Sequence, residues 1–122
     1  MKHILSLVLL SLCFATHAED LDLSTKQEIE HLFNYLKDSG CEFNRNGTWY
    51  GSSEAVNHLR KKYDYLVGKG MLTSSEAFIQ KAASESSMSG KPYQVKCAEK
   101  EVVLSSLWFT AELKKYRNSH SR

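Results

Sequence analysis

Apolar residues recur at intervals of three and four along much of this chain, which is the spacing of an amphipathic helix. The first such segment has its apolar positions at Ile29, Leu32, Phe33 and Leu36. Ser24 to Gln27 has the form of a capping box, in which the two side chains bond each other's backbone amides. We therefore expect a first helix that starts at Ser24 and is ended by Gly40.

Three further segments show the same helical spacing, at about 52–68, 73–88 and 105–117. Ser52 or Ser53 is expected to cap the second helix, and a Thr-x-x-Glu capping box opens the third. The last helix presents the apolar residues Trp108, Phe109, Leu113 and Tyr116.

The segments between these helices predict a small antiparallel sheet. Glu42–Arg45 and Thr48–Tyr50 flank Asn46-Gly47, a pair that favours the tight turn of a hairpin. Pro92–Cys97 reads as one more short strand, placed to pair with that hairpin. The predicted fold is α+β and mainly α, with about four helices, a sheet from hairpin 42–50 and strand 92–97, and one disulfide.

The disulfide follows from the number and position of the cysteines. Cys13 lies in the N-terminal apolar segment, which has the form of a cleaved signal peptide, so the mature protein is expected to keep only Cys41 and Cys97. Two cysteines in an exported protein are expected to pair. Closing a loop of about 57 residues would stabilise the fold by roughly 4 kcal/mol in the chain-entropy model.

The N-terminus has the form of a secretory signal peptide. Lys2 precedes an apolar run from Ile4 to Ala15, and Thr16-His17-Ala18 offers a cleavage site after Ala18. A membrane anchor is the competing interpretation, but the run is shorter than the roughly 20 apolar residues that a span needs. We expect a signal peptide at 1–18, a single small globular domain at 19–122, and no membrane span after cleavage.

Composition and motifs exclude several classes of function. The formal net charge is only +2, which gives no reason to expect a nucleic-acid partner. The chain lacks H-E-x-x-H, G-x-S-x-G and a Gly-rich phosphate loop, and its histidines lack metal-ligand spacing. We therefore predict no cofactor and no metal.

The second predicted helix carries a polar stripe beside its apolar arc. His58, Lys62 and Tyr65 follow each other at i, i+4 and i+7. They could form the rim of a binding site, or Lys62 and Tyr65 could cover the edge of the core while their polar tips stay in water. Nearby aromatics such as Trp49, Tyr50 and Tyr93 could stack on a ligand if exposed, or belong to the core.

The third predicted helix places Glu85 and Ser86 on its buried side. A buried carboxylate needs a partner or becomes protonated. Arg45 would suit best, because its planar fork can meet a carboxylate through two hydrogen bonds. Two interpretations stay open: a structural ion pair between Arg45 and Glu85, or a shallow polar pocket formed by Arg45, His58, Glu85 and Ser86.

Four long motifs together resemble a known family. They read C-E-F-N-R-N-G-T-W-Y, A-V-N-H-L-R-K-K-Y-D-Y-L, F-I-Q-K-A-A-S-E-S-S-M-S-G-K-P-Y-Q-V-K-C and S-S-L-W-F-T-A-E-L-K-K-Y-R. As a set they resemble the YfeK-like family of small exported Gram-negative bacterial proteins, a domain of unknown function, over about residues 41–117. Glu99-Lys100 and Phe109 depart from the family pattern. The resemblance implies periplasmic residence and adds no reaction.

The sequence leads to three hypotheses about function. The first is a non-enzymatic module of the cell envelope that binds a protein, peptide or glycan through the hairpin and the His58 side of the second helix. Its candidate binding residues are Arg45, His58, Lys62, Glu85 and Ser86. The alternative is a hydrolase or transferase that uses a His58, Glu85 and Ser86 site, which requires these groups to lie within hydrogen-bond reach of each other. The third is a structural or stress-protective envelope protein with no small ligand.

Overall fold

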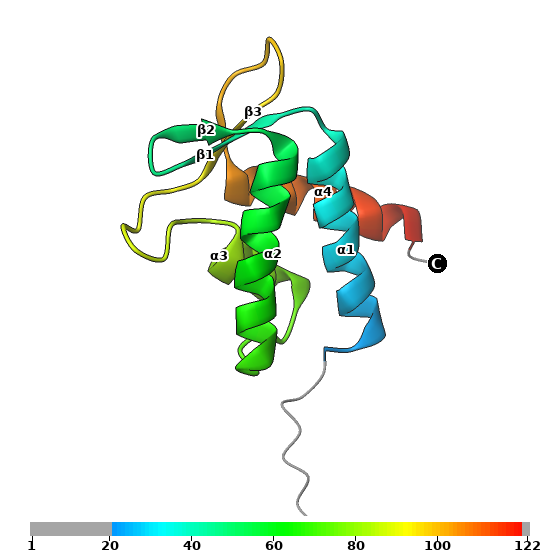
Figure 1. The fold of residues 1–122 in the computed structure, drawn as a ribbon. Coiled ribbons are helices and arrows are strands. Elements are labelled where there is room, and N and C mark those ends of the chain that lie inside the picture. The colour runs from blue at the N-terminus through cyan, green and yellow to red at the C-terminus, as the bar shows by residue number, and fades with distance from the viewer. Residues whose placement is uncertain (1–20, 121–122) are drawn as a thin grey trace, which may run out of the picture.

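The computed structural model describes residues 21–120, and the predicted signal peptide, with Cys13, lies outside them. The helices are α1 (Leu23–Asp38), α2 (Ser52–Gly68), α3 (Ser75–Ala82) and α4 (Ser105–His120). Figure 1 shows α1 and α2 side by side, with the sheet at one end of this pair and α4 crossing behind α1. The predicted class is confirmed: the fold is α+β and mainly helical. In this part of the chain no helix is long and apolar enough to cross a membrane.

The sheet has four antiparallel strands in the order β2-β1-β3-β4. They are β1 (Glu42–Arg45), β2 (Thr48–Tyr50), β3 (Gln94–Lys96) and β4 (Val103–Leu104). Asn46 and Gly47 both take positive φ, 54° and 84°, as the predicted hairpin turn requires. β3 pairs with β1 as expected. β4 was not predicted, because two residues are too few to show an alternating pattern.

The disulfide between Cys41 and Cys97 is confirmed. It joins the residue before β1 to the residue after β3, so it closes the same pair of strands that the backbone hydrogen bonds hold together. The bridge spans a sequence separation of 56 residues. Half of the described chain therefore lies inside one covalent loop, which limits the conformations open to the unfolded state.

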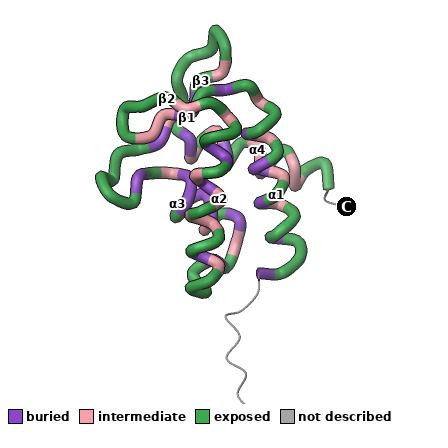
Figure 2. The backbone as a smooth tube through the Cα atoms, viewed as in Figure 1, coloured by how far each residue is buried: buried purple, intermediate pink, exposed green. Residues whose placement is uncertain are grey.

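The hydrophobic core lies between the helices and the inner face of the sheet (Figure 2). Its largest fully buried side chains are aromatic or branched: Tyr93, Phe33, Phe43, Phe78, Phe109, Ile29, Leu32, Leu36, Leu59 and Val95. Phe33, Tyr63 and Phe78 meet edge to face, with ring centroids 5.2–5.8 Å apart, so the rings interlock α1, α2 and α3. Phe43 and Val95 continue this core across β1 and β3.

The predicted N-terminal caps of the first two helices were wrong. Asp22 caps α1, because its carboxylate accepts the Thr25 amide hydrogen at 2.8 Å, so the helix starts one residue before Ser24. Gly51 is the N-cap of α2, without a side-chain cap. The Ser52 hydroxyl instead donates to the Cys41 carbonyl at 2.6 Å, which ties α2 to the start of β1. The Ser52 hydroxyl, which the local sequence pattern predicts to cap the helix, is therefore used in a tertiary hydrogen bond instead.

The third helix is shorter than predicted. Ser74, rather than the predicted Thr73, caps α3 by accepting the Ala77 amide hydrogen, and the helix ends at Ala82 rather than near Met88. The Ser84 hydroxyl then donates back to the Ile79 carbonyl, and residue 85 forms a backbone bridge with Pro92. The segment that follows α3 is a loop, so the predicted helical placement of Glu85 and Ser86 was wrong.

Candidate functional site

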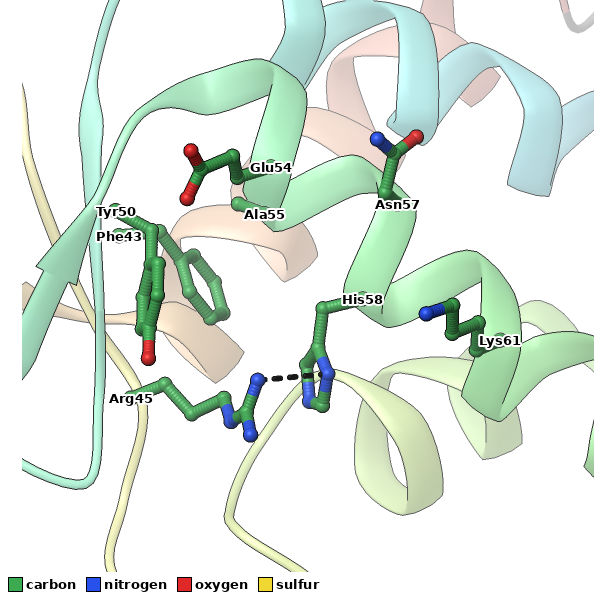
Figure 3. A pocket seen from close by; sticks show the side chains of 8 residues that line it. All are labelled: Phe43, Arg45, Tyr50, Glu54, Ala55, Asn57, His58 and Lys61. Atoms are coloured by element: carbon green, nitrogen blue, oxygen red, sulfur yellow. Dashed lines mark hydrogen bonds between the residues drawn. The ribbon is translucent and has the colours of Figure 1, made fainter.

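A cleft of about 230 Å³ lies between the β1–β2 hairpin and the first turns of α2 (Figure 3). Its lining residues are Phe43, Arg45, Tyr50, Glu54, Ala55, Asn57, His58 and Lys61. All of them come from residues 43–61, so one hairpin and the helix that follows it supply the whole lining. The hairpin contributes the aromatic wall and Arg45, and α2 contributes most of the other polar groups.

Arg45 lies on β1 and reaches across the cleft to α2. Its Nη1 donates to His58 Nδ1 at 2.9 Å, as the dashed line in Figure 3 marks, and its guanidinium lies 5.6 Å from the centroid of the Tyr50 ring. Within residues 21–120 no carboxylate lies within 4.0 Å of this guanidinium. The ion pair with Glu85 that we considered from the sequence is therefore not formed there.

His58 is held at both of its ring nitrogens. Because a guanidinium only donates, Nδ1 of His58 must be the acceptor, and the ring hydrogen of the neutral imidazole lies on Nε2. Nε2 then donates to the Tyr93 hydroxyl at 3.3 Å. Burial lowers the pKa of His58 to about 4, and the nearby charges of Arg45, Lys62 and Lys61 add to this effect. The imidazole is thus neutral at pH 7.

Lys62 lies behind the cleft rather than in its lining. Its Nζ donates to the Glu85 carbonyl at 3.0 Å and to the Tyr93 hydroxyl at 3.2 Å. Burial lowers the pKa of Lys62. The third residue of the predicted stripe, Tyr65, is 62% exposed and does not join this group. The structure therefore brings together Arg45, His58 and Lys62 around Tyr93, a buried tyrosine that accepts from both His58 and Lys62.

Glu85 and Ser86 lie apart from the cleft lining. Glu85 is exposed, and its contact with Lys62 runs through the backbone carbonyl. Ser86 is buried, and its hydroxyl accepts the amide hydrogens of Met88 and Ser89 at 3.3 Å each, which stabilises the turn after α3. No hydrogen bond joins any two of the side chains of His58, Glu85 and Ser86 in the described residues, so nothing there favours the hydrolase or transferase hypothesis.

The sequence interpretation missed several residues of the cleft. Glu54 and Lys61 share a helical face with His58, at spacings of four and three, and that periodicity could have identified them. Tyr93, which supports His58 and Lys62 from outside the lining, was considered only as a stacking or core aromatic. Periodicity could not reveal its contacts with α2, because they span 31 to 35 residues of sequence. Among the other aromatics considered, Trp49 is exposed and Tyr50 partly buried. Among residues 21–120, no group of three or more histidine, cysteine, aspartate or glutamate side chains could hold a metal ion.

Comparison with known proteins gives a family without an assigned activity. Residues 23–117 match the family of unknown function DUF5329. The chain is also 45% identical over 51 residues to the uncharacterized protein YfeK of Salmonella typhimurium, and the match spans 42% of this chain and 41% of that protein. No solved structure matches the chain. The predicted resemblance is confirmed, and it includes α1, which the quoted motifs left outside.

Proposed function

The chain belongs to the family of unknown function DUF5329, and we propose that it is a small non-enzymatic binding module of the cell envelope. Its ligand site is the cleft between the β1–β2 hairpin and α2, where Arg45 binds the ligand and His58 holds Arg45 in position. The ligand is an envelope protein, peptide or glycan that places an acidic group in the cleft.

The observation that carries this proposal is the difference between Arg45 and the other two arginines of residues 21–120. Arg60 bonds both carboxylate oxygens of Glu30, and Arg117 bonds both oxygens of Glu28. Arg45 is also held in a defined position, but by neutral groups, the His58 imidazole and the Tyr50 ring. A fixed guanidinium without a carboxylate in this part of the chain is suited to bind an anion from outside.

The hydrogen bonds at both ring nitrogens of His58 support a binding role over a catalytic one. A general base needs a nitrogen free to take a proton from the substrate. In His58, Nδ1 accepts from Arg45 and Nε2 carries the hydrogen that is donated to Tyr93, so neither nitrogen is free. The same two bonds hold the ring still, and the ring in turn fixes Arg45 at the cleft.

Export to the periplasm is part of this proposal. The disulfide between Cys41 and Cys97 is of the kind that persists in oxidising compartments, and the periplasm is one of these. The signal-peptide pattern of residues 1–18 supports the same location, with residues 19–122 as a single mature domain.

The test is an NMR titration of the oxidised, ¹⁵N-labelled protein with envelope extract separated into protein, peptide and glycan fractions. We expect one fraction to shift the amide signals of residues 43–61, and Arg45→Ala to abolish the shifts while the variant stays folded. Lys69→Ala is the matched control, because Lys69 is the residue that follows α2, carries an exposed positive charge and does not line the cleft. The proposal fails if no fraction shifts these signals, or if Arg45→Ala responds like the wild type.

A further inference from the structure

We propose that the cleft binds the α-carboxylate end of an amino acid, with Arg45 on the carboxylate and Glu54 on the neighbouring nitrogen. The carboxylate belongs either to the C-terminal residue of a peptide or to a free amino acid, which present the same chemistry. This inference rests on the proposed function, because it specifies the ligand of the same cleft.

First, Arg45 has hydrogen-bond donors that no group in residues 21–120 uses. A guanidinium carries five N–H groups. In residues 21–120 the only hydrogen bond of the Arg45 guanidinium is the one from Nη1 to His58. The Nε and Nη2 hydrogens therefore remain available as a parallel pair, the geometry that holds both oxygens of a carboxylate. The Tyr50 ring beside the guanidinium and the fixed His58 ring restrict its rotation, so little freedom is lost when the anion binds.

The second step is the charge of the lining. Arg45 and Lys61 are cations, Glu54 is the one acid among the residues that line the cleft, and His58 is neutral at pH 7. The lining thus carries a single net positive charge. It balances a carboxylate, which is a monoanion, better than a phosphate group, which carries close to two negative charges at this pH.

The third step is the separation of opposite charges within the cleft. In the view of Figure 3, the Glu54 carboxylate and the Arg45 guanidinium lie at different ends, with the Tyr50 ring between them. A ligand that bridges them needs an acceptor at one end and an N–H donor at the other. An amino-acid end group has both, because its carboxylate lies two bonds from an ammonium or amide nitrogen.

The fourth step is size and polarity. The cleft volume of about 230 Å³ is below the range of about 300–1,000 Å³ that is typical of pockets for drug-sized ligands. It suits one residue rather than several. The partly exposed ring of Tyr50, backed by the buried side chains of Phe43 and Ala55, can pack against the side chain of that residue.

The experiment titrates the same labelled protein with four defined probes: leucine, N-acetyl-leucine, N-acetyl-leucinamide and inorganic phosphate. We expect at least one of the two carboxylates to shift the amide signals of residues 43–61 and to bind about tenfold or more tightly than the carboxamide, which lacks the charge-assisted bonds. Arg45→Lys should weaken that binding, since it keeps the charge and removes the planar fork.

Glu54→Gln distinguishes the two sources of the carboxylate. If free amino acids are the ligand, leucine binds the wild type more tightly than N-acetyl-leucine does, and Glu54→Gln removes that advantage. If peptide ends are the ligand, N-acetyl-leucine binds more tightly, and Glu54→Gln leaves it nearly unchanged, because a glutamine oxygen still accepts from an amide N–H. Lys69→Ala should match the wild type with every probe.

The inference is overturned if N-acetyl-leucinamide binds as well as the tighter of the two carboxylates, if phosphate binds more tightly than both of them, or if no probe shifts the cleft signals. In each of these cases an envelope fraction that still shifts residues 43–61 in an Arg45-dependent way would leave the proposed function standing. Failure of both titrations would remove the proposed function as well.

Discussion

The two ends of this molecule use arginine in opposite ways. At the end away from the sheet, Arg117 of α4 bonds Glu28 of α1 and Glu76 of α3, and the Ser75 hydroxyl also donates to Glu28. At the sheet end, the Cys41–Cys97 bridge closes the framework, and Arg45 is held by neutral groups. Arg117, which is paired with carboxylates, has a structural role that the fold explains. Arg45 is fixed in position without a carboxylate, which is the arrangement expected of a ligand-binding residue.

The largest effect is expected from breaking the covalent link of the sheet end. Cys41→Ser with Cys97→Ser should lower the free energy of unfolding by about 4 kcal/mol, because the open chain regains conformational freedom when it unfolds. Urea denaturation monitored by circular dichroism measures this. A reducing agent should produce a similar loss in the wild type and none in the double variant. Equal midpoints for the oxidised and reduced wild type would show that the bridge is not a main support of this end.

A smaller effect is expected from removing the ionic link at the other end. Arg117→Ala should lower the free energy of unfolding by about 1 kcal/mol, since the network is partly exposed and solvent screens it. Glu28, whose side chain is 13% exposed, would lose its main partner. The matched change Arg45→Ala should lower stability by less than about 0.5 kcal/mol, because it leaves no carboxylate without a partner within residues 21–120. An Arg45→Ala protein less stable than Arg117→Ala would reverse the comparison.

An effect no larger than that of Arg117→Ala separates the two ends by pH. Burial and nearby cations lower the pKa of His58 from 6.5 to about 4, so the unfolded chain binds a proton in this interval that the folded protein does not. The contribution of His58 to the free energy of unfolding should therefore be fully present above pH 6.5 and decrease as the pH falls toward 4. The decrease should be on the order of 1 kcal/mol, because His58 is only partly buried and solvent screens the charges.

The carboxylates of the other end respond in a lower range. The hydrogen bond from Arg117 lowers the pKa of both Glu28 and Glu76 below the usual 4.5. Their contribution is present above pH 4.5 and is lost as pH falls through the lowered values. Denaturation of the wild type and of His58→Gln between pH 7 and 4.5 tests whether His58 causes the fall in stability. In the variant, the free energy of unfolding should depend much less on pH over this range. An unchanged dependence on pH would mean that other groups cause the fall.

Local features of this fold could be predicted from the sequence, and contacts between distant segments could not. The hairpin at Asn46-Gly47 was predictable because the turn chemistry of two residues decides it. The pairing of Cys41 with Cys97 followed from the count of cysteines. The end of α3 was missed although helical periodicity continues in the sequence. The Ala83 carbonyl at its C-cap accepts from the hydroxyl of the distant Ser105, and the chain then turns so that residue 85 bridges Pro92.

The same limit applies to the candidate site. His58 and Lys62 were identified as polar residues beside an apolar arc, and Arg45 as a hairpin residue in need of a partner. The structure joins His58 and Lys62 at Tyr93 and bonds Arg45 to His58. Their arrangement could not be predicted, because it depends on how β3 places Tyr93 between β1 and α2. Glu85 was considered as a partner of Arg45 only on the expectation of a longer α3.

The lining of the cleft has a consequence for how specificity can change over time. Because residues 43–61 supply every lining group, a single exchange of this stretch between relatives would transfer the whole set of contacts at once. Tyr93, encoded about thirty residues further on, would have to be kept so that the transferred histidine retains its hydrogen-bond partner. Such a site can diversify as one inherited block while the rest of the scaffold stays the same.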